Sequence, residues 1–368
     1  MKEQKKLKVL LVASEFAPGM IPFAATIINT LARDVRFDVH CICVNSKNKS
    51  YLGLVEQKAN PIYIEYPSSK VVKMIYKVWP FKVISEINKV RKVYNPDVVH
   101  FLTGDFTLAF YVRCYKDAKM FYTVHDLHPH EVKLDTLLEK IIFKYVVWGY
   151  RKCRESIDNL TTSSLTQLKE LKQLYVNKKC EYTPFPSLVI SSIMHGTKTP
   201  VELEHIDDYI LFFGSVNSYK GVDMLIRAFE SSKICANYKM VVAGKGLDYP
   251  IKSSNIIRLN RFIDDDEIAQ LFKKAKLVVY PYVTATMSGV LSLAYFFNKL
   301  VLASDIPFFK EYATKSVYFF KAGDVDDLRA HIEDMVENVD TSHIDNTGYE
   351  RLFGEKALID SYWKLYTE

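Results

Sequence analysis

Several features that mark other classes of protein are missing from this sequence of 368 residues. No apolar run approaches the roughly 20 residues that a membrane-spanning helix needs, and the charged N-terminus leads into a strand-like run, not a signal-peptide core. The six cysteines form no Cys-x-x-Cys pair, and none lies near a histidine pair of metal-ligand type. We therefore expect a cytoplasmic protein with reduced thiols.

Charge and composition also exclude the specialised classes. Hydrophobic residues make up 49% and charged residues 25% of the chain, which is typical of a globular protein and excludes a disordered one. The net charge of +6 is mild, and we expect no nucleic-acid partner. At roughly 150 residues per domain, the length predicts two domains.

Short apolar runs rich in β-branched residues recur along the chain, with helical patterns between them. The runs are residues 9–12, 39–44, 62–64, 98–102, 121–124, 160–163, 210–213, 240–242, 256–259, 277–280, 300–302 and 317–320. This alternation predicts βαβ units around buried parallel sheets, and so an α/β protein with two doubly wound domains.

Prolines and glycines interrupt the periodic pattern between about residues 184 and 207. We therefore predict a first domain over residues 1–190 and a second over residues 204–350. The segment from Tyr349 to Tyr366 has aromatic and aliphatic residues at helical spacing, which predicts a terminal helix within residues 351–368.

The loops that follow strands carry the candidate functional residues, because ligands of open α/β sheets bind beyond the carboxyl ends of the strands. Gly19 lies just before a predicted helix, where a glycine lets the backbone approach a phosphate or sugar closely. The alternative is a glycine that serves only the turn, because no Gly-x-Gly-x-x-Gly pattern is present.

A histidine-rich loop follows the strand that ends near residue 124. Three histidines and two acids lie within residues 123–131, and they could suggest a metal site. A partly solvated histidine loop is the alternative, and we expect no metal. His125 stands at the strand end, from which a side chain projects into an interdomain cleft, so we predict a functional role for it.

Two loops of the second half suggest phosphate binding. Gly214 ends a strand and Lys220 precedes a helix, so the lysine can reach the anionic oxygens of a diphosphate; taken alone, such a lysine is usually just solvated. Thr286, Ser288 and Gly289 lead from a strand into an almost wholly apolar helix, in the form of a phosphate cradle. The alternative here is an ordinary Ser/Thr helix cap.

Taken in order, the motifs of the second half resemble a known family. They are Gly214…Lys220-Gly-Val-Asp-Met-Leu, Val241-Val-Ala-Gly-Lys-Gly246, Arg261-Phe-Ile-Asp-Asp-Asp-Glu267, Tyr280-Pro-Tyr…Thr286-Met-Ser-Gly289 and Val301-Leu-Ala-Ser-Asp305…Glu311. Their order and spacing resemble the C-terminal half of a GT-B glycosyltransferase of family 4. In the first half, Gly19, the strand around His100 and the pair His125-Asp126 fall where that family has its glycine loop, a strand and a cleft histidine.

The resemblance implies a GT-B fold, with two Rossmann-like doubly wound domains facing an interdomain cleft and a terminal helix that crosses back to the first domain. It implies a retaining transfer from a nucleoside-diphosphate sugar, held mainly by the second domain, without a required metal or cofactor. We expect UDP as the nucleotide and a glycan or lipid-linked glycan as the acceptor, in bacterial surface polysaccharide synthesis.

The family's functional residues carry over as follows. The predicted catalytic residues are His125 and Lys220, and the predicted donor-binding residues are Gly19, Gly214, Ser215, Lys220, Thr286, Ser288, Gly289 and Glu311. Lys220 would stabilise the charge that develops on the departing diphosphate, helped by the neutral donors of the Thr286 to Gly289 turn. His125 would orient a hydroxyl of the donor sugar or the acceptor.

The chain also departs from the family pattern. Ala285 and Leu293 stand where family 4 usually has its Glu-x7-Glu pair, and Ser215 stands where an arginine is common. The sequence resembles instead the branch of the family with a Thr-x-Ser-Gly turn, found among surface-polysaccharide enzymes. The missing acids keep a non-catalytic GT-B protein that binds a glycan or a partner as the alternative; a GT-B epimerase or phosphorylase has no supporting carboxylate set here.

A basic segment lies in the first half. Residues 70–92 contain seven basic residues, one acid and interleaved aromatics. We predict that this surface docks on the anionic inner leaflet of the membrane, so that the protein would be peripheral there. The alternative is a helix that covers the sheet with solvated lysines.

Overall fold

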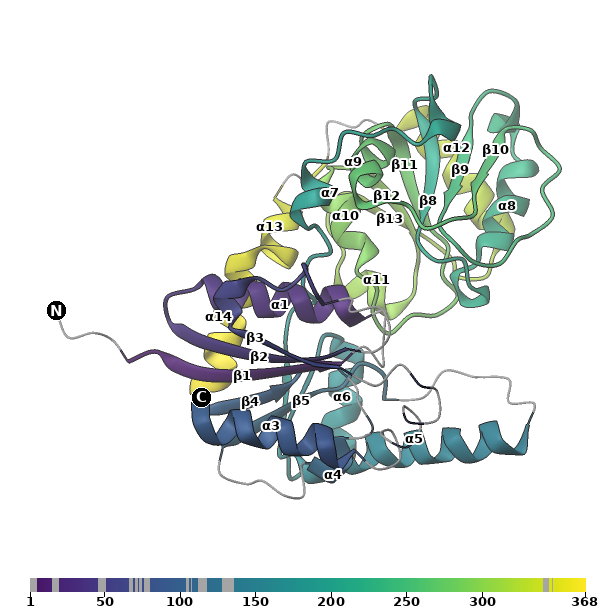
Figure 1. The fold of residues 1–368 in the computed structure, drawn as a ribbon. Helices are drawn as coiled ribbons and strands as arrows, with labels where there is room; N and C mark the ends of the chain where they lie inside the picture. Colours follow the sequence, from purple (N-terminus) through teal and green to yellow (C-terminus); the bar gives the residue numbers. More distant parts are fainter. Residues whose placement is uncertain are drawn as a thin grey trace. The chain divides into compact units, whose positions relative to one another are not determined.

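The structure is a computed structural model, and it describes residues 5–14, 20–45, 51–65, 69, 72, 75, 80–103, 106, 108–111, 118–127, 136–339, 344–345 and 347–368. The chain divides into two compact units (Figure 1). Unit 1 is Met1–Pro186 together with Glu355–Glu368, and unit 2 is Ser187–Gly354. Each unit has a parallel sheet with helices on both faces, which confirms the predicted fold class of two Rossmann-like α/β domains.

The sheet of unit 1 has seven described strands in the order β3-β2-β1-β4-β5-β6-β7. They are β1 (Leu7–Ser14), β2 (Phe37–Asn45), β3 (Pro61–Glu65), β4 (Val98–Phe101), β5 (Lys119–Thr123), β6 (Asn159–Thr162) and β7 (Lys179–Tyr182). All pairs are parallel. The strand order reverses between β1 and β4, which is the place where such sheets bind ligands.

Helices cover both faces of this sheet. They are α1 (Ile21–Arg33), α3 (Phe81–Tyr94), α4 (Leu108–Tyr111), α5 (Leu137–Ser156), α6 (Leu165–Leu174), α14 (Glu355–Thr367) and the 3-10 turn η2 (Gln57–Ala59). The helix α1 packs against α14 on one face, and α4 joins α3 and α5 on the other. The central strands β1 and β4 are largely buried, as expected for a parallel sheet covered on both faces, whereas the edge strands β3 and β7 are mostly half-buried.

Unit 2 repeats this plan with six described strands in the order β10-β9-β8-β11-β12-β13. They are β8 (Tyr209–Phe213), β9 (Met240–Ala243), β10 (Ile256–Leu259), β11 (Ala275–Tyr280), β12 (Leu300–Ser304) and β13 (Val317–Phe320), again all parallel. The order reverses between β8 and β11. The loops that follow these two strands therefore meet at the centre of the sheet edge.

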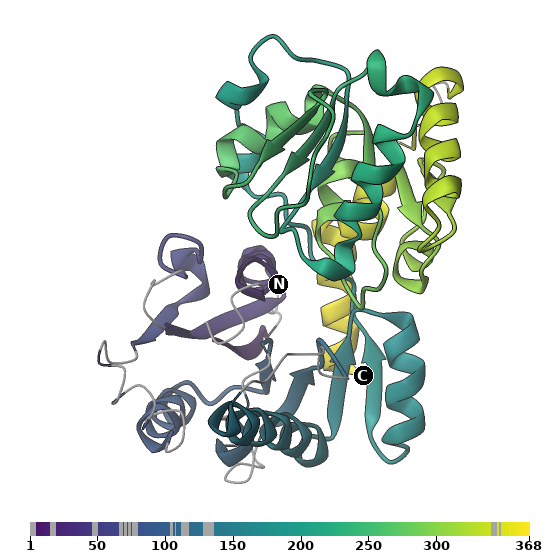
Figure 2. The same ribbon diagram turned by 90° about the vertical axis from the view of Figure 1, so that its right-hand side faces the viewer.

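The helices of unit 2 also form two layers. They are α7 (Ser191–Met194), α8 (Val222–Glu230), α9 (Asp265–Lys273), α10 (Val290–Phe296), α11 (Pro307–Glu311), α12 (Val325–Asn338), α13 (Gly348–Phe353) and the 3-10 turns η3 (Val201–Leu203), η4 (Ser218–Lys220) and η5 (Lys233–Ala236). The helix α12, yellow-green in Figure 2, lies along one face of the sheet beside α8. On the other face, α7 contacts α9 and α10 contacts α13.

The terminal segment differs from its prediction as one helix. It is broken at Gly354 into α13, which belongs to unit 2, and α14, which belongs to unit 1. A Cβ at Gly354 would lie 2.4 Å from the carbonyl oxygen of Glu350, so only glycine fits this break. The polypeptide therefore passes back to unit 1 at a glycine.

The helix α14 is held to unit 1 by a buried polar network. The Tyr366 hydroxyl lies 2.7 Å from His100 Nδ1, and His100 Nε2 lies 2.9 Å from Thr123 Oγ1. At the surface, Arg36 pairs with Asp360 at 3.1 Å. Burial lowers the pKa of His100 to about 3, so the ring is neutral at pH 7 and serves as a structural link between the sheet and the terminal helix.

Candidate functional site

The two phosphate-binding loops predicted from the sequence meet in unit 2. Gly214 to Gly221 follow β8 and Pro281 to Gly289 follow β11, the neighbouring strand at the point where the strand order reverses. The backbones touch directly: Val283 N–H donates to the Tyr219 carbonyl at 2.8 Å. A Cβ at Gly221, whose φ is +63°, would lie 2.0 Å from the Pro281 carbonyl oxygen. Glycine at 221 therefore allows the two loops to join.

A third loop, after β9, extends the site. Val216 N–H donates to the Lys245 carbonyl, and Leu247 N–H donates back to the Val216 carbonyl at 2.8 Å. A Cβ at Gly244, whose φ is +136°, would lie 2.0 Å from the Gly214 carbonyl oxygen. The glycine of this Gly-Lys-Gly pattern thus lets two backbones lie side by side, and this close approach was not predicted from the sequence.

Lys220 lies at the centre of these loops. Its side chain is only 6% exposed, and its Nζ lies 5.2 Å from the ring centroid of Tyr282 and 3.2 Å from the position of a Cβ on Gly214. No carboxylate pairs with it among the described residues. Burial lowers the pKa of this amine. A buried cation without an anionic partner is costly, and a bound anion would offset that cost.

Tyr282 is a further residue of the candidate site, and it was not predicted from the sequence. Its ring is fully buried, and its hydroxyl lies 3.5 Å from Ser288 Oγ and 4.0 Å from the position of a Cβ on Gly214. Burial raises the pKa of the hydroxyl, so it remains a hydrogen-bond donor at pH 7. The Ser304 hydroxyl holds the backbone of Tyr282 in place by donating a hydrogen bond to its carbonyl at 2.6 Å. The Tyr280-Pro-Tyr motif is the sequence feature from which this residue could have been predicted.

The turn from Thr286 to Gly289 borders the same space. Thr286 and Ser288 are half-buried and Gly289 is buried. Gly289 is the N-cap of α10, and among the described residues no side chain caps this helix. The alternative of an ordinary Ser/Thr cap is therefore absent at this position. Leu293, which stands where the family has an acid, is 1% exposed inside α10.

The other predicted donor-binding residues of unit 2 lie less centrally. Ser215 is exposed, and Asn217 Nδ2 donates to its hydroxyl at 3.2 Å. Glu311 is half-buried at the end of α11. That helix is close to the site, because its Phe309 packs on Tyr282 with ring centroids 5.3 Å apart. Both residues stay predictions as donor ligands.

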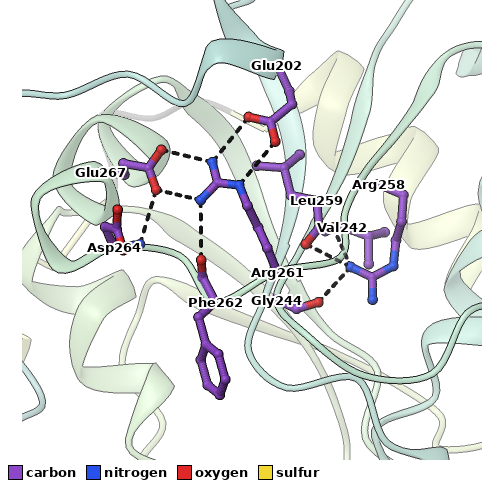
Figure 3. A network of polar contacts seen from close by, with 9 residues as sticks. All are labelled: Glu202, Val242, Gly244, Arg258, Leu259, Arg261, Phe262, Asp264 and Glu267. Carbon is purple, nitrogen blue, oxygen red and sulfur yellow. Dashed lines mark hydrogen bonds and ion pairs between the residues drawn. The ribbon is translucent and has the colours of Figure 1, made fainter.

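A network of charges follows β10 in the same unit (Figure 3). Arg261 donates two hydrogen bonds to Glu267, at 2.7 and 2.8 Å, and two to Glu202, both at 3.1 Å. Arg258 donates to the carbonyls of Val242 and Gly244, at 3.1 and 2.6 Å. Arg258 thereby fixes the backbone of the glycine loop that adjoins Gly214. Neither arginine had a role predicted from the sequence.

His125 belongs to unit 1 and follows β5. Its Nε2 donates to the Leu102 carbonyl at 2.7 Å, and its ring packs edge-on against Phe23 with centroids 4.8 Å apart. Burial lowers the pKa of the ring, so it is neutral at pH 7. With the proton on Nε2, Nδ1 is an acceptor, and this buried atom has no hydrogen-bond partner among the described residues. A buried polar atom without a partner is unusual in a folded protein, and it marks Nδ1 as a candidate ligand contact.

A small cavity of unit 1 lies beside this histidine. Its volume is about 140 Å³, and its lining residues are Met20, Tyr122, Val124, His125, Asp126, Tyr150 and Arg154. The described residues contain no group of three His, Cys, Asp or Glu side chains that could hold a metal. Gly19 and the rest of the histidine loop, residues 128–131, lie outside the described residues.

Part of the chain matches a known protein family. Residues 198–350 match the model of the family Glycosyl transferases group 1. A search of curated protein sequences finds no significant match. The match to the family model covers the three loops around Lys220 and the Arg261 network.

Solved structures resemble the whole chain. Sucrose-phosphate synthase from Thermosynechococcus elongatus superposes with a TM-score of 0.70 at 12% identity, covering 98% of both chains. HepE from Anabaena, in complex with UDP-glucose, superposes with a TM-score of 0.69 at 13% identity, covering 98% of this chain and 100% of that one. WaaG, a glycosyltransferase involved in lipopolysaccharide biosynthesis, superposes with a TM-score of 0.58 at 13% identity, covering 98% of both chains. The chain therefore has the GT-B fold, and its second unit matches the Glycosyl transferases group 1 family over residues 198–350, which indicates a glycosyltransferase.

Proposed function

We propose that the protein transfers a sugar from a nucleoside-diphosphate sugar to a glycan or lipid-linked glycan acceptor, with retention of configuration. The observation that carries the proposal is Lys220, a buried cation without an anionic partner among the described residues, at the centre of three strand-end loops. A diphosphate is the anion of matching chemistry. UDP is the proposed nucleotide, in line with the UDP-glucose complex of HepE.

The leaving diphosphate gathers negative charge as the glycosidic bond breaks. Lys220 supplies a positive charge there, and the Tyr282 hydroxyl and the turn at Ser288 supply neutral hydrogen-bond donors. Because these groups are already in place, little reorganisation is needed during the reaction. Residues 214–221 and 281–289 contain no Asp or Glu, so we propose no covalent enzyme intermediate from these loops.

The acceptor side is assigned to unit 1. The neutral ring of His125 offers Nδ1 as an acceptor for a sugar hydroxyl, while its Nε2–H is held by Leu102. The neighbouring cavity is lined by aromatic side chains and by the charged residues Asp126 and Arg154, which are groups suited to sugar recognition. We propose that His125 orients the reacting hydroxyl, in a cytoplasmic reaction that contributes to bacterial surface polysaccharide.

Calorimetric titration of the purified protein with UDP, GDP and ADP tests the donor assignment. We expect UDP to bind more tightly than the other two, and UDP-glucose turnover to follow in the presence of an acceptor glycan. Failure of all three nucleotides to bind would contradict the proposal. UDP binding without any transfer to a panel of acceptors would favour a non-catalytic GT-B protein, a result for which Ala285 and the buried Leu293 would be the structural reason.

A further inference from the structure

The helix α5 of unit 1 has two halves with different surroundings. Its C-terminal half packs closely: a Cβ at Gly149 would lie 2.5 Å from the Phe106 carbonyl oxygen, and Cys153 is fully buried in the core. Trp148 in this half packs on Phe110 of α4, with ring centroids 5.8 Å apart. The N-terminal half, residues 137–144, runs out beyond the strands (Figure 1).

The protruding half exposes four aliphatic side chains. Leu137 is 75% exposed, Leu138 63%, Ile141 56% and Ile142 47%. Their spacing of one and four residues puts them on one face of the helix. Contiguous exposed apolar surface on a soluble protein marks a site of interaction with another surface. We call these four residues the apolar face of α5.

Basic residues border the apolar face. Lys140 and Lys144 each follow an apolar residue by three positions, so they lie beside it on the helix surface. Both are exposed, and neither forms an ion pair with a described residue. The two acids of α5 are already engaged: Glu139 closes the capping box with Thr136, and Glu155 pairs with Lys152 at 2.6 Å.

The helix as a whole is positively charged. Its basic residues are Lys140, Lys144, Arg151, Lys152 and Arg154, against the acids Glu139 and Glu155. An apolar face with a basic border is the pattern of a helix that lies in the interface of an anionic membrane, with aliphatic groups among the acyl chains and lysines at the headgroups.

We propose that the N-terminal half of α5 docks the protein on an anionic lipid bilayer. We assign to this docking the purpose of presenting a lipid-linked acceptor, and that purpose rests on the proposed function. The docking itself does not depend on the proposed function. The contact is peripheral, since no helix among the described residues is long and apolar enough to cross a bilayer.

Two observations favour lipid over a second copy of the chain. A symmetric dimer through this face would place the unpaired Lys140 and Lys144 of one copy near those of the other, and like charges repel. An anionic bilayer instead attracts both lysines while it buries the four aliphatic side chains.

The basic segment 70–92 is a weaker candidate in the structure. Part of it lies outside the described residues. In the described helix α3, Lys89 pairs with Glu86 at 2.7 Å, and Arg91 is 6% exposed. These two charges are therefore less available to lipid headgroups than Lys140 and Lys144. We assign the primary contact to α5.

Co-sedimentation with vesicles tests the proposal. The full chain is mixed with vesicles of phosphatidylglycerol and phosphatidylcholine, or of phosphatidylcholine alone, at low salt. We expect binding to the anionic vesicles only, and at least a tenfold loss of binding for the double variant Leu137→Ser/Ile141→Ser. Lys140→Glu/Lys144→Glu should lose binding to a similar extent, because the anionic surface would then repel the helix.

The matched control is Leu174→Ser/Val176→Ser, which removes two aliphatic side chains that are 59% and 77% exposed at the end of α6. It should sediment like the parent. Equal vesicle binding by the parent and the Leu137/Ile141 variant would overturn the proposal, as would a parent dimer in analytical ultracentrifugation that this variant dissociates.

The donor site provides an independent measurement. The Leu137/Ile141 variant should bind UDP as the parent does, which shows that unit 2 is folded and that only the docking is lost. If the parent binds anionic vesicles but no nucleotide, the donor assignment fails and the docking proposal stands. If it binds nucleotide but no anionic vesicles, the docking proposal fails alone.

Discussion

The loops after β8 and after β10 lie at the same edge of the second sheet, and each carries a basic residue. Arg261, after β10, donates four hydrogen bonds to two carboxylates. Lys220, after β8, is more deeply buried and has no carboxylate partner among the described residues. The pKa of Arg261 is raised by its Glu267 and Glu202 partners, whereas burial lowers the pKa of Lys220.

This difference separates a structural cation, Arg261, from Lys220, the cation to which we assign a role in donor binding. Arg261 donates four hydrogen bonds to carboxylates, which satisfy its charge and tie η3 to α9, and a fifth to the Phe262 carbonyl at 3.3 Å (Figure 3). Little capacity is left for a ligand. Lys220 is held in an environment that opposes its charge, and perturbed groups of this kind cluster at functional sites. The protein thus stabilises one loop with internal ion pairs, and we propose that a bound substrate supplies the anionic partner of the other.

The largest expected effect is that of Lys220→Ala. Loss of the cation that faces the diphosphate should lower turnover on the order of 100-fold or more and weaken UDP binding, while thermal unfolding stays cooperative. The measurements are steady-state transfer and calorimetry. The control is Lys299→Ala, a half-buried lysine at the opposite edge of the sheet that donates to the Lys273 and Ala275 carbonyls. Unchanged turnover in folded Lys220→Ala would remove the distinction between the two loops.

Arg261→Ala should lower the stability of the fold and leave UDP binding almost unchanged, which is the reverse of the effects expected for Lys220→Ala. It leaves the nearly buried Glu267 without its partner, so we expect the free energy of unfolding to fall by about 1 to 3 kcal/mol. At a temperature where the variant is folded, its UDP dissociation constant should stay within about twofold of the parent, on the scale of measurement error. Denaturant titration and calorimetry give the two numbers. A large loss of UDP affinity in the folded variant would show that this loop also contacts the donor.

The hydroxyls of the turn after β11 should contribute less than Lys220. Thr286→Val and Ser288→Ala each remove one neutral hydrogen bond, worth about 0.5 to 2 kcal/mol, and so should raise the UDP dissociation constant roughly 2- to 30-fold. Ser231→Ala, at the C-terminal end of α8, is the control in the same unit. If both turn variants bind UDP as the parent does, the turn is no phosphate cradle.

The smallest expected effects concern how stability and UDP binding change with pH. The loop of Lys220 should respond at alkaline pH, and the loop of Arg261 should respond at acidic pH. An unfolded lysine keeps its proton up to about 10.5, and the folded pKa of Lys220 is lower. Between these two pKa values the unfolded chain binds more protons than the folded one, so the contribution of Lys220 to stability rises with pH. Over the same range UDP binding weakens, because Lys220 loses its positive charge. The pKa of Glu267 is lowered from 4.5 by Arg261, so its contribution is present above 4.5 and is lost as pH falls below it.

Profiles of stability and UDP affinity against pH, measured for the parent and for Lys220→Arg, test this pair of expectations. The arginine stays charged throughout, so the weakening of UDP binding at alkaline pH should disappear in that variant. The loss of stability below pH 4.5 should remain, because it belongs to the loop after β10. A parent whose UDP affinity does not change up to pH 10.5 would contradict the lowered pKa of Lys220.

The sequence was sufficient for the architecture because buried parallel strands must be apolar along their whole length. All the predicted apolar runs correspond to strands of the two sheets. The strand β7 was not predicted, since Lys179–Tyr182 is short, polar and at the sheet edge. Adjacent helical patterns on either side of Gly354 likewise predicted one helix, because periodicity says nothing about which unit each turn packs against.

The amino-acid sequence by itself determined the two α/β units and the loops that carry Lys220 and the Thr286 to Gly289 turn, because apolar patterning and the order of glycine and polar residues are local properties. Only the tertiary structure decided which charges are satisfied. Arg261 finds a carboxylate 59 positions away at Glu202, whereas Lys220 is enclosed by aromatic rings and backbone. Partners so distant in sequence become neighbours only through the packing of the strands, and that packing leaves Lys220 without a carboxylate partner among the described residues.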